Sequence, residues 1–152
     1  MLPYPCLVDS LTLVLIVLLA STLAGVAYRL LRGRGHEVKR KERIDLSRLP
    51  TEKNGIATSL LGKHATLIQF STQYCGQCPG VRRQLSQLEY RLGGISFLEV
   101  DITDRIDIAA HFGISQTPTV FVLNQKSELV YRIGGVPNLK ILNEELAKLG
   151  AK

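Results

Sequence analysis

The fold is decided by residues 65–94, which read ATLIQFSTQYCGQCPGVRRQLSQLEYRLGG. The first seven residues form an apolar run that favours a buried central strand. From Cys75 onward the apolar residues recur every three or four positions, which predicts an amphipathic helix that stops at Gly93 and Gly94. Two cysteines, Cys75 and Cys78, therefore lie where a buried strand gives way to a helix.

Strand and helix patterns alternate on both sides of this stretch. Further strands are predicted over residues 44–49, 96–100, 119–123 and 129–133, with a polar turn at 124–127 that joins the last two as a hairpin, and further helices over 55–61, 104–112 and 138–149. The order is β-α-β-α-β-α-β-β-α. Because helices separate most of the strands, we expect an α/β domain over 44–152, with a mixed sheet covered on both faces.

The N-terminal part of the chain has a different character. Leu11 to Tyr28 contains eighteen residues without a charge, which at about 1.5 Å per helical residue can just cross a hydrocarbon core of about 30 Å. A buried core helix would carry a polar stripe, and this run has only Ser and Thr. A cleaved signal peptide would have a basic segment before the run, and here a basic cluster follows it instead. We predict a short N-terminal segment over 1–10, a transmembrane helix over 11–31 and a basic tether over 32–43.

The net charge of +6 has a local origin in this tether region. Seven Lys and Arg residues lie between positions 29 and 43, and none precedes the apolar run. The positive-inside rule then favours a single-pass protein whose domain faces the cytoplasm, with an extracytoplasmic domain as the alternative. The cluster is short, adjoins the apolar run and lacks interleaved aromatic residues. Anionic lipid headgroups therefore explain it better than nucleic acid, which we do not expect as a partner.

The motif Cys75-Gly76-Gln77-Cys78 places two thiols at the predicted start of a helix. Unpaired backbone N–H groups and the helix dipole favour a thiolate at such a position. The spacing also allows the second sulfur to reach the first within one turn. Cys75, at the open edge of the turn, is predicted to be the nucleophile, and Cys78, facing inward, to resolve the mixed disulfide.

A metal site and an inert structural disulfide are the alternative readings of the motif. A structural zinc or an iron–sulfur cluster needs four ligands, but there is no second CxxC, and His36, His64 and His111 are far apart in the sequence. A domain with this many apolar residues does not need a disulfide to fold. We expect no metal and no cofactor beyond the redox-active disulfide. The third cysteine, Cys6, precedes the apolar run and is expected to be incidental.

The central region resembles the thioredoxin superfamily. The resemblance rests on FSTQYCGQC at 70–78, Thr117-Pro118-Thr119 before an apolar strand, and Gly134 after the next strand, and it covers roughly residues 44 to 149. It implies the thioredoxin fold, exchange with protein thiols and disulfides, and a cis Thr117–Pro118 bond that faces the cysteines. In this family that loop keeps metal from the sulfurs and pairs with an extended substrate. The implied substrate-binding residues are Tyr74, Gly76, Gln77, Thr117, Pro118 and Gly134.

The chain also departs from the family pattern. Tyr74 replaces the usual Trp, Gly76-Gln77 replaces Gly-Pro, and Arg83 stands where a kinking proline is expected. Gln69 and Phe97 occupy the positions at which thioredoxins carry a buried Asp and a Lys that help to move the proton of the resolving thiol. Because a glutamine does not titrate, we expect slower disulfide reduction than a general thioredoxin achieves, and a dedicated substrate.

The leading hypothesis is therefore a membrane-tethered thiol–disulfide oxidoreductase that acts on protein cysteines near the bilayer, including those of a membrane partner. One alternative is a binding or assembly module that uses the thioredoxin cleft to hold a partner, although such a module has no need for both sulfurs. The other alternative is an extracytoplasmic disulfide reductase that serves cytochrome or secreted-protein maturation.

Overall fold

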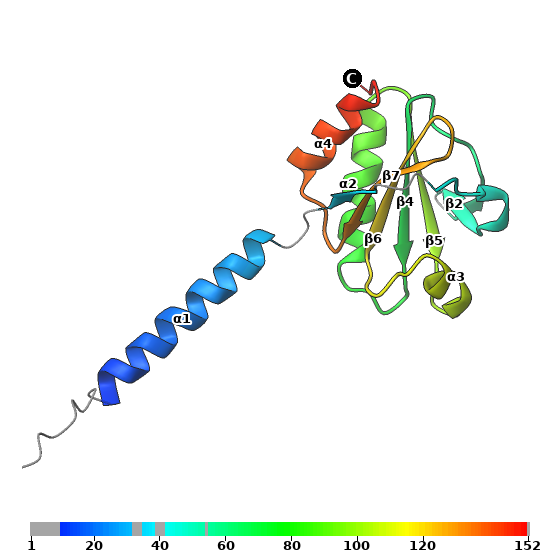
Figure 1. Cartoon of the computed structure of the whole chain (residues 1–152). Helices are drawn as coiled ribbons and strands as arrows, with labels where there is room; N and C mark the ends of the chain where they lie inside the picture. Colours follow the sequence, from blue (N-terminus) through cyan, green and yellow to red (C-terminus); the bar gives the residue numbers. More distant parts are fainter. Residues whose placement is uncertain (1–9, 32–34, 39–41, 54, 152) are drawn as a thin grey trace, which may run out of the picture. The chain divides into compact units, whose positions relative to one another are not determined.

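A computed structural model of the chain describes residues 10–31, 35–38, 42–53 and 55–151 (Figure 1). The chain forms two units, Met1–Arg32 and Gly33–Lys152. The predicted N-terminal segment lies outside the described residues except for Ser10, which begins the first helix.

The first unit contains the helix α1 (Ser10–Leu31). Its Ser10–Tyr28 portion has a mean hydropathy of 2.3, and none of it is buried. By length and composition α1 can cross a membrane, a test that a signal sequence near an N-terminus also passes. The hydroxyls of Ser21 and Thr22 donate to the carbonyl of Leu18 one turn earlier, at 3.0 and 2.9 Å. These polar groups are therefore satisfied within the helix, as a hydrocarbon environment requires.

The second unit is built on a mixed sheet of seven strands in the order β1-β7-β6-β4-β5-β2-β3. The strands are β1 (His36–Glu37), β2 (Thr51–Lys53), β3 (Ile56–Ala57), β4 (Ala65–Ser71), β5 (Ile95–Asp101), β6 (Thr119–Asn124) and β7 (Leu129–Gly134). The helices are α2 (Cys78–Arg91), α3 (Ile106–His111) and α4 (Leu139–Lys148), with a 3-10 turn, η1 (Leu46–Arg48). The central strand β4 runs parallel to β5 and antiparallel to β6.

Both faces of the central strand are buried, as its apolar sequence predicts. Ala65 and Leu67 pack into a core with residues of α2 and α4, whereas Ile68 and Phe70 pack into a second core with residues of α3 and η1. Helices therefore cover the sheet on both sides (Figure 1), which confirms the predicted α/β class. This arrangement fixes the end of β4, and with it the turn that carries the two cysteines.

The aromatic centre of the second core supplies a stability prediction. The Phe70 ring is fully buried, with its centroid 4.8 Å from that of Phe121 and 5.8 Å from that of Phe112. Phe70→Ala is expected to lower the free energy of unfolding by about 3–5 kcal/mol, because it leaves a cavity beneath α3. Denaturant unfolding of the full chain in a non-ionic detergent measures the change.

The control for this measurement is Tyr90→Ala, whose side chain is 93% exposed on α2. It should stay within about 0.5 kcal/mol of the wild type. A Phe70→Ala variant as stable as the control would mean that Phe70 is not part of a packed core.

The strand predicted over 44–49 is wrong. Ile44, Leu46 and Leu49 are buried as an inward-facing strand would require, but the chain turns through η1. The Asp45 carboxylate accepts hydrogen bonds from the backbone N–H and the hydroxyl of Ser47, at 3.1 and 2.6 Å. Such local side-chain bonds to the backbone stabilise a turn against a strand. The first strand of this region is β2, which begins at Thr51.

The helix predicted over 55–61 is also wrong, because the chain forms the short strand β3 there. Gly55 has a φ of +77°, the left-handed region in which glycine is favoured, and it lies in the turn that returns the chain alongside β2. The Thr58 N–H donates to the Thr51 carbonyl at 2.9 Å and extends the pairing. Cross-strand pairing therefore overrides the local helical pattern.

The sheet of the domain includes residues that precede position 44, the predicted start of the domain. His36 and Glu37 pair with Arg132 and Tyr131 of β7 as an edge strand, and Arg43 forms an isolated bridge with Glu128. The remaining residues of the predicted tether, 32–34 and 39–41, lie outside the described part of the chain. The described part of the 32–43 segment therefore belongs to the sheet, and is not a free linker.

Candidate functional site

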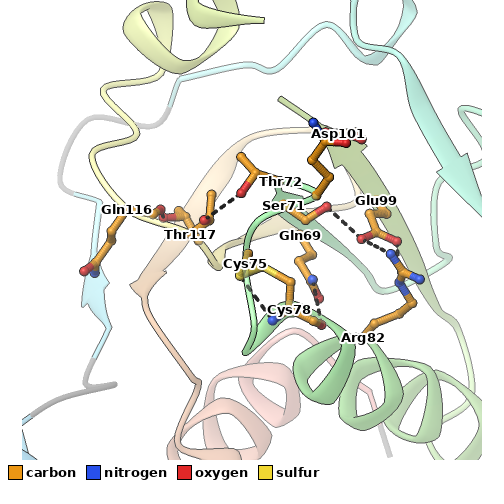
Figure 2. The surroundings of a disulfide bond; sticks show 12 residues. Gln69, Ser71, Thr72, Cys75, Cys78, Arg82, Glu99, Asp101, Gln116 and Thr117 are labelled. Atoms are coloured by element: carbon orange, nitrogen blue, oxygen red, sulfur yellow. Dashed lines mark hydrogen bonds and ion pairs between the residues drawn. A yellow bond between two sulfur atoms is a disulfide. The ribbon is translucent and has the colours of Figure 1, made fainter. Parts of the chain in front are cut away.

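Cys75 and Cys78 lie in the turn between β4 and α2 and form a disulfide (Figure 2). The Cys75 N–H donates to the Thr72 carbonyl at 3.1 Å, and the Cys78 N–H donates to the Cys75 carbonyl at 3.2 Å. The helix begins at Cys78, three residues after the predicted start. Pro79 occupies its first turn, where a missing N–H removes no helical hydrogen bond.

The two sulfur-bearing residues differ in exposure. Cys75 is partly exposed, whereas Cys78 is only 2% exposed. The Cys75 Sγ atom also accepts a hydrogen bond from the Cys78 N–H at 3.2 Å. In the reduced protein this N–H, at the start of α2, would stabilise a thiolate on Cys75. The geometry can therefore offer one activated sulfur to a substrate and keep the second beneath it.

The loop before β6 comes close to the cysteine turn. The Thr117–Pro118 peptide bond is cis, as the resemblance implies. The Thr117 hydroxyl lies 3.4 Å from the Thr72 hydroxyl and so links this loop to the residues that precede the disulfide (Figure 2). Pro118 is buried, and its carbonyl accepts a hydrogen bond from the Gly135 N–H at 2.7 Å.

Gly134 lies at the end of β7, where it pairs with Thr119 of β6. A Cβ atom at this position would meet the Nε2 atom at the far end of the Gln116 side chain, so Gly134 and the residue before Thr117 are close neighbours. The structure thus brings Thr117, Pro118 and Gly134 into one loop cluster, although they are up to seventeen positions apart in the sequence.

The other three predicted substrate-binding residues lie on the exposed rim of the cysteine turn. Tyr74 is 85% exposed, so its ring is open to a partner. Gly76 is exposed, and a Cβ atom there would meet nothing within 4 Å. Gln77 is exposed and caps α2 without a side-chain hydrogen bond to the helix.

Gln69 of β4 lies beside Cys78 (Figure 2). Its side chain is fully buried, and its Nε2 atom donates to the Cys78 carbonyl at 3.1 Å. Its Oε1 atom has no hydrogen-bond partner among the described residues. Phe97, the other position at which the family pattern is broken, is buried on β5 in the core that α2 covers.

A carboxylate beside Gln69 was missed by sequence reasoning. Glu99 is the register partner of Gln69 on the parallel neighbour β5. It accepts hydrogen bonds from the Ser71 hydroxyl at 2.8 Å and from Arg82 of α2 at 2.7 Å, and its second oxygen lies 2.6 Å from the Arg82 Nε atom. The hydrogen bond to Glu99 raises the pKa of the Arg82 guanidinium.

The sequence could have indicated that Arg82 lies near the site, because Arg82 follows Cys78 by one helical turn on α2. Its partner Glu99 depends on strand register, which the sequence pattern did not fix.

In the described part of the chain, no group of three or more His, Cys, Asp or Glu residues is placed to hold a metal ion. The groups that the structure brings together at the site are the two sulfurs, the cis-proline loop and the buried side chain of Gln69.

Comparisons with known proteins agree with this geometry. The model of the thioredoxin family matches residues 51–148. The chain is similar to the thioredoxin of Mycoplasma genitalium, with 27% identity over 81 residues that cover 53% of this chain and 79% of the relative. It is also similar to the thioredoxin of Gallus gallus, with 27% identity over 88 residues that cover 58% of this chain and 82% of the relative.

Solved structures show the same fold. A mutant thioredoxin of Halobacterium salinarum superposes with a TM-score of 0.51 at 17% identity, and the match covers 57% of this chain and 75% of that one. The long form of thioredoxin f from spinach chloroplast superposes with a TM-score of 0.50 at 24% identity, and the match covers 58% of this chain and 72% of that one.

Proposed function

The chain belongs to the thioredoxin family and is a thiol–disulfide oxidoreductase, and we propose that it exchanges disulfides with protein cysteines through Cys75 and Cys78 while anchored in a membrane. The observation that carries the proposal is the asymmetry of the disulfide. The partly exposed Cys75 sulfur accepts an N–H at the start of a helix, and Cys78 is buried behind it. This is the arrangement that dithiol exchange requires.

The proposed reaction has two steps. The Cys75 thiolate attacks a substrate disulfide, so that one sulfur–sulfur bond forms to Cys75 and the substrate bond breaks, releasing the first substrate thiolate. Cys78 then loses its proton and attacks the Cys75 sulfur, and the mixed disulfide breaks to release the second thiolate. The substrate gains two electrons and the protein ends as the Cys75–Cys78 disulfide. A dithiol donor returns the protein to its reduced form by the reverse exchange.

The residues around the disulfide are proposed to hold the substrate. Tyr74, Gly76 and Gln77 form the exposed rim of the turn, and Thr117, Pro118 and Gly134 form the loop cluster beside it. An extended substrate segment would run between the two sets and pair with backbone groups of the cis-proline loop. The hydroxyl pair of Thr72 and Thr117 would keep that loop in register with the cysteines.

We further propose that α1 anchors the protein and that the domain faces the cytoplasm. The helix is long and apolar enough to cross a bilayer, and its described side chains are exposed. The cations follow the helix and do not precede it, which supports the cytoplasmic side. Anchoring raises the effective concentration toward cysteines near the bilayer, so a membrane protein is the proposed partner.

Reduction of insulin disulfides tests the proposed activity and its expected speed. The full chain in detergent, supplied with a dithiol, should reduce insulin more slowly than a general thioredoxin, by up to about 100-fold. The reason is that the Gln69 carboxamide does not titrate and so cannot take the proton of Cys78, which water or the substrate must accept instead.

The matched variant is Gln69→Asp, which should recover part of the rate. A chain that reduces neither insulin nor any small disulfide would contradict the proposed activity. A chain as fast as a general thioredoxin would contradict only the role given to Gln69.

A further inference from the structure

In the oxidised protein only one end of the Gln69 carboxamide has a hydrogen-bond partner among the described residues. It lies in the middle of β4 with no exposed surface, and its Nε2 atom donates to the Cys78 carbonyl at 3.1 Å. Its Oε1 atom, equally buried, finds no donor in the described residues. A buried acceptor without a donor is costly to a fold, so its presence beside a reactive group calls for an explanation.

The orientation of the carboxamide follows from its one hydrogen bond. Only the NH₂ end can donate to the Cys78 carbonyl, because the reverse orientation would set two oxygen atoms against each other. The Oε1 atom is the other end of the carboxamide, and Figure 2 shows the group beside Cys78. Solvent has little access to this space, since Cys78 is only 2% exposed.

The redox state of Cys78 decides whether a donor is present. In the disulfide its sulfur carries no hydrogen, so it has nothing to donate to Gln69. In the dithiol the same sulfur carries an S–H group, which is a weak donor. Two donors of the described part of the site are already engaged elsewhere, because Arg82 and the Ser71 hydroxyl both donate to Glu99.

We propose that Gln69 is a redox-linked hydrogen-bond acceptor whose Oε1 atom accepts the S–H of reduced Cys78. This inference rests on the proposed exchange through Cys75 and Cys78. When two molecules of glutathione reduce the protein, the Cys75–Cys78 bond breaks, the two glutathione thiols are oxidised to glutathione disulfide, and each cysteine sulfur gains one of their protons. The proton on Cys78 then lies in the bond to Gln69, whereas that on Cys75 exchanges with solvent.

Two consequences follow for the reaction. The bond exists only in the reduced protein, so it shifts the dithiol–disulfide equilibrium toward the dithiol. It also holds the proton on the resolving sulfur, which delays the attack of Cys78 on the mixed disulfide. Gln69 therefore keeps the proton on the Cys78 sulfur, whereas a carboxylate at the same position would remove that proton.

The equilibrium with glutathione tests the inference. The full chain, carrying Cys6→Ser and kept in a non-ionic detergent, is equilibrated with mixtures of reduced and oxidised glutathione, and the disulfide fraction is read by alkylation and mass. Gln69→Met, which keeps the length of the side chain but removes the amide oxygen, should shift the equilibrium about fivefold toward the disulfide, because the S–H group, although a weak donor, satisfies an acceptor that is otherwise buried without one.

Gln84→Met is the matched control. Gln84 lies on α2, and its Oε1 atom is the other buried amide oxygen without a partner in the described residues. Its replacement should leave the equilibrium within about twofold, because it does not contact the disulfide. An equal shift in both variants, or none in Gln69→Met, would overturn the inference. A wild-type chain that fails to equilibrate with glutathione at all would instead overturn the proposed exchange on which the inference rests.

A second measurement needs no replacement of Gln69, and so holds even if Gln69→Met does not fold. In the Cys6→Ser/Cys75→Ser chain, Cys78 is the only thiol. Its infrared S–H stretching band should lie at lower wavenumber than that of a simple thiol dissolved in hexane, because an accepting oxygen weakens the S–H bond. A band at the position of the free thiol would overturn the inference.

Discussion

Cys75→Ser is expected to abolish disulfide exchange, whereas Cys78→Ser is expected to stop the reaction at a mixed disulfide with the substrate. Without the Cys75 sulfur no exposed nucleophile remains at the site, because Cys78 is only 2% exposed. Without the Cys78 sulfur the first step still proceeds, but nothing displaces the substrate from Cys75. Exchange by Cys75→Ser should fall to the background rate, and Cys78→Ser should accumulate covalent adducts that a reducing agent releases.

The measurement is a comparison of non-reducing gels and insulin reduction for the two variants. Cys6→Ser is the matched control, since it removes the one cysteine outside the Cys75-Gly76-Gln77-Cys78 motif, and it should behave as the wild type. Recovery of no adduct from cells that express Cys78→Ser would count against protein disulfides as substrates. If the double variant Cys75→Ser/Cys78→Ser restored the phenotype of a deletion strain, the domain would act as a binding module.

The local sequence was sufficient to predict those strands and helices whose burial follows a periodic apolar pattern. The seven residues of β4 are apolar enough to be buried on both faces, and the apolar residues Val81, Leu85 and Leu88 of α2 face the core as their spacing predicts. The position of the two cysteines between these elements follows directly. The cis Thr117–Pro118 bond came from the family resemblance, because nothing local distinguishes it from an ordinary proline at the start of a strand.

The sequence-based prediction failed where pairing with another strand or a side-chain hydrogen bond to the backbone determines the secondary structure. The strands β1 and β3 have only two residues each, too few for a periodic pattern. Each forms a strand because another strand offers hydrogen bonds: β1 pairs with β7, which is distant in the sequence, and β3 pairs with the preceding strand β2. Asp45 converts an apolar pattern that suits a strand into the turn η1 by binding the N–H of Ser47. Neither effect leaves a periodic signal in the sequence.

The side chain of Gln69 also shows the difference between what the local sequence predicts and what depends on tertiary contacts. The sequence identified Gln69 as unusual because it lies six positions before Cys75, where the family carries an acid. It could not reveal that one end of the carboxamide binds the Cys78 carbonyl and leaves the other end without a donor. It also could not place Glu99 beside Gln69, because that requires the register between β4 and β5. The cysteine motif can be read from the local sequence, whereas the contacts of Gln69 and Glu99 depend on the tertiary structure.

Deletion of residues 1–31 is expected to move the protein from the membrane fraction to the soluble fraction. The full chain should stay with the membrane through an alkaline carbonate wash, because α1 contributes an apolar surface long enough to cross the bilayer. Removal of electrostatic contacts by high salt should not release it, since a spanning helix does not depend on lipid headgroup charge. A full chain that is soluble, or one shortened at its N-terminus by a signal peptidase, would contradict the anchor.

The sidedness of the anchor can be tested with two cysteines that lie on either side of α1 in the sequence, Cys6 and Cys75. In Cys6→Ser/Cys78→Ser, Cys75 is the only thiol, and in Cys75→Ser/Cys78→Ser, Cys6 is the only thiol. The positive-inside rule places them on opposite sides, so a membrane-impermeant maleimide should label Cys6 in intact cells and Cys75 only after permeabilisation. That result would place the site among cytosolic reductants and support a reductase fed from the cytoplasm. The reverse labelling would put the disulfide outside the cell, where the same geometry would serve the maturation of cytochromes or secreted proteins.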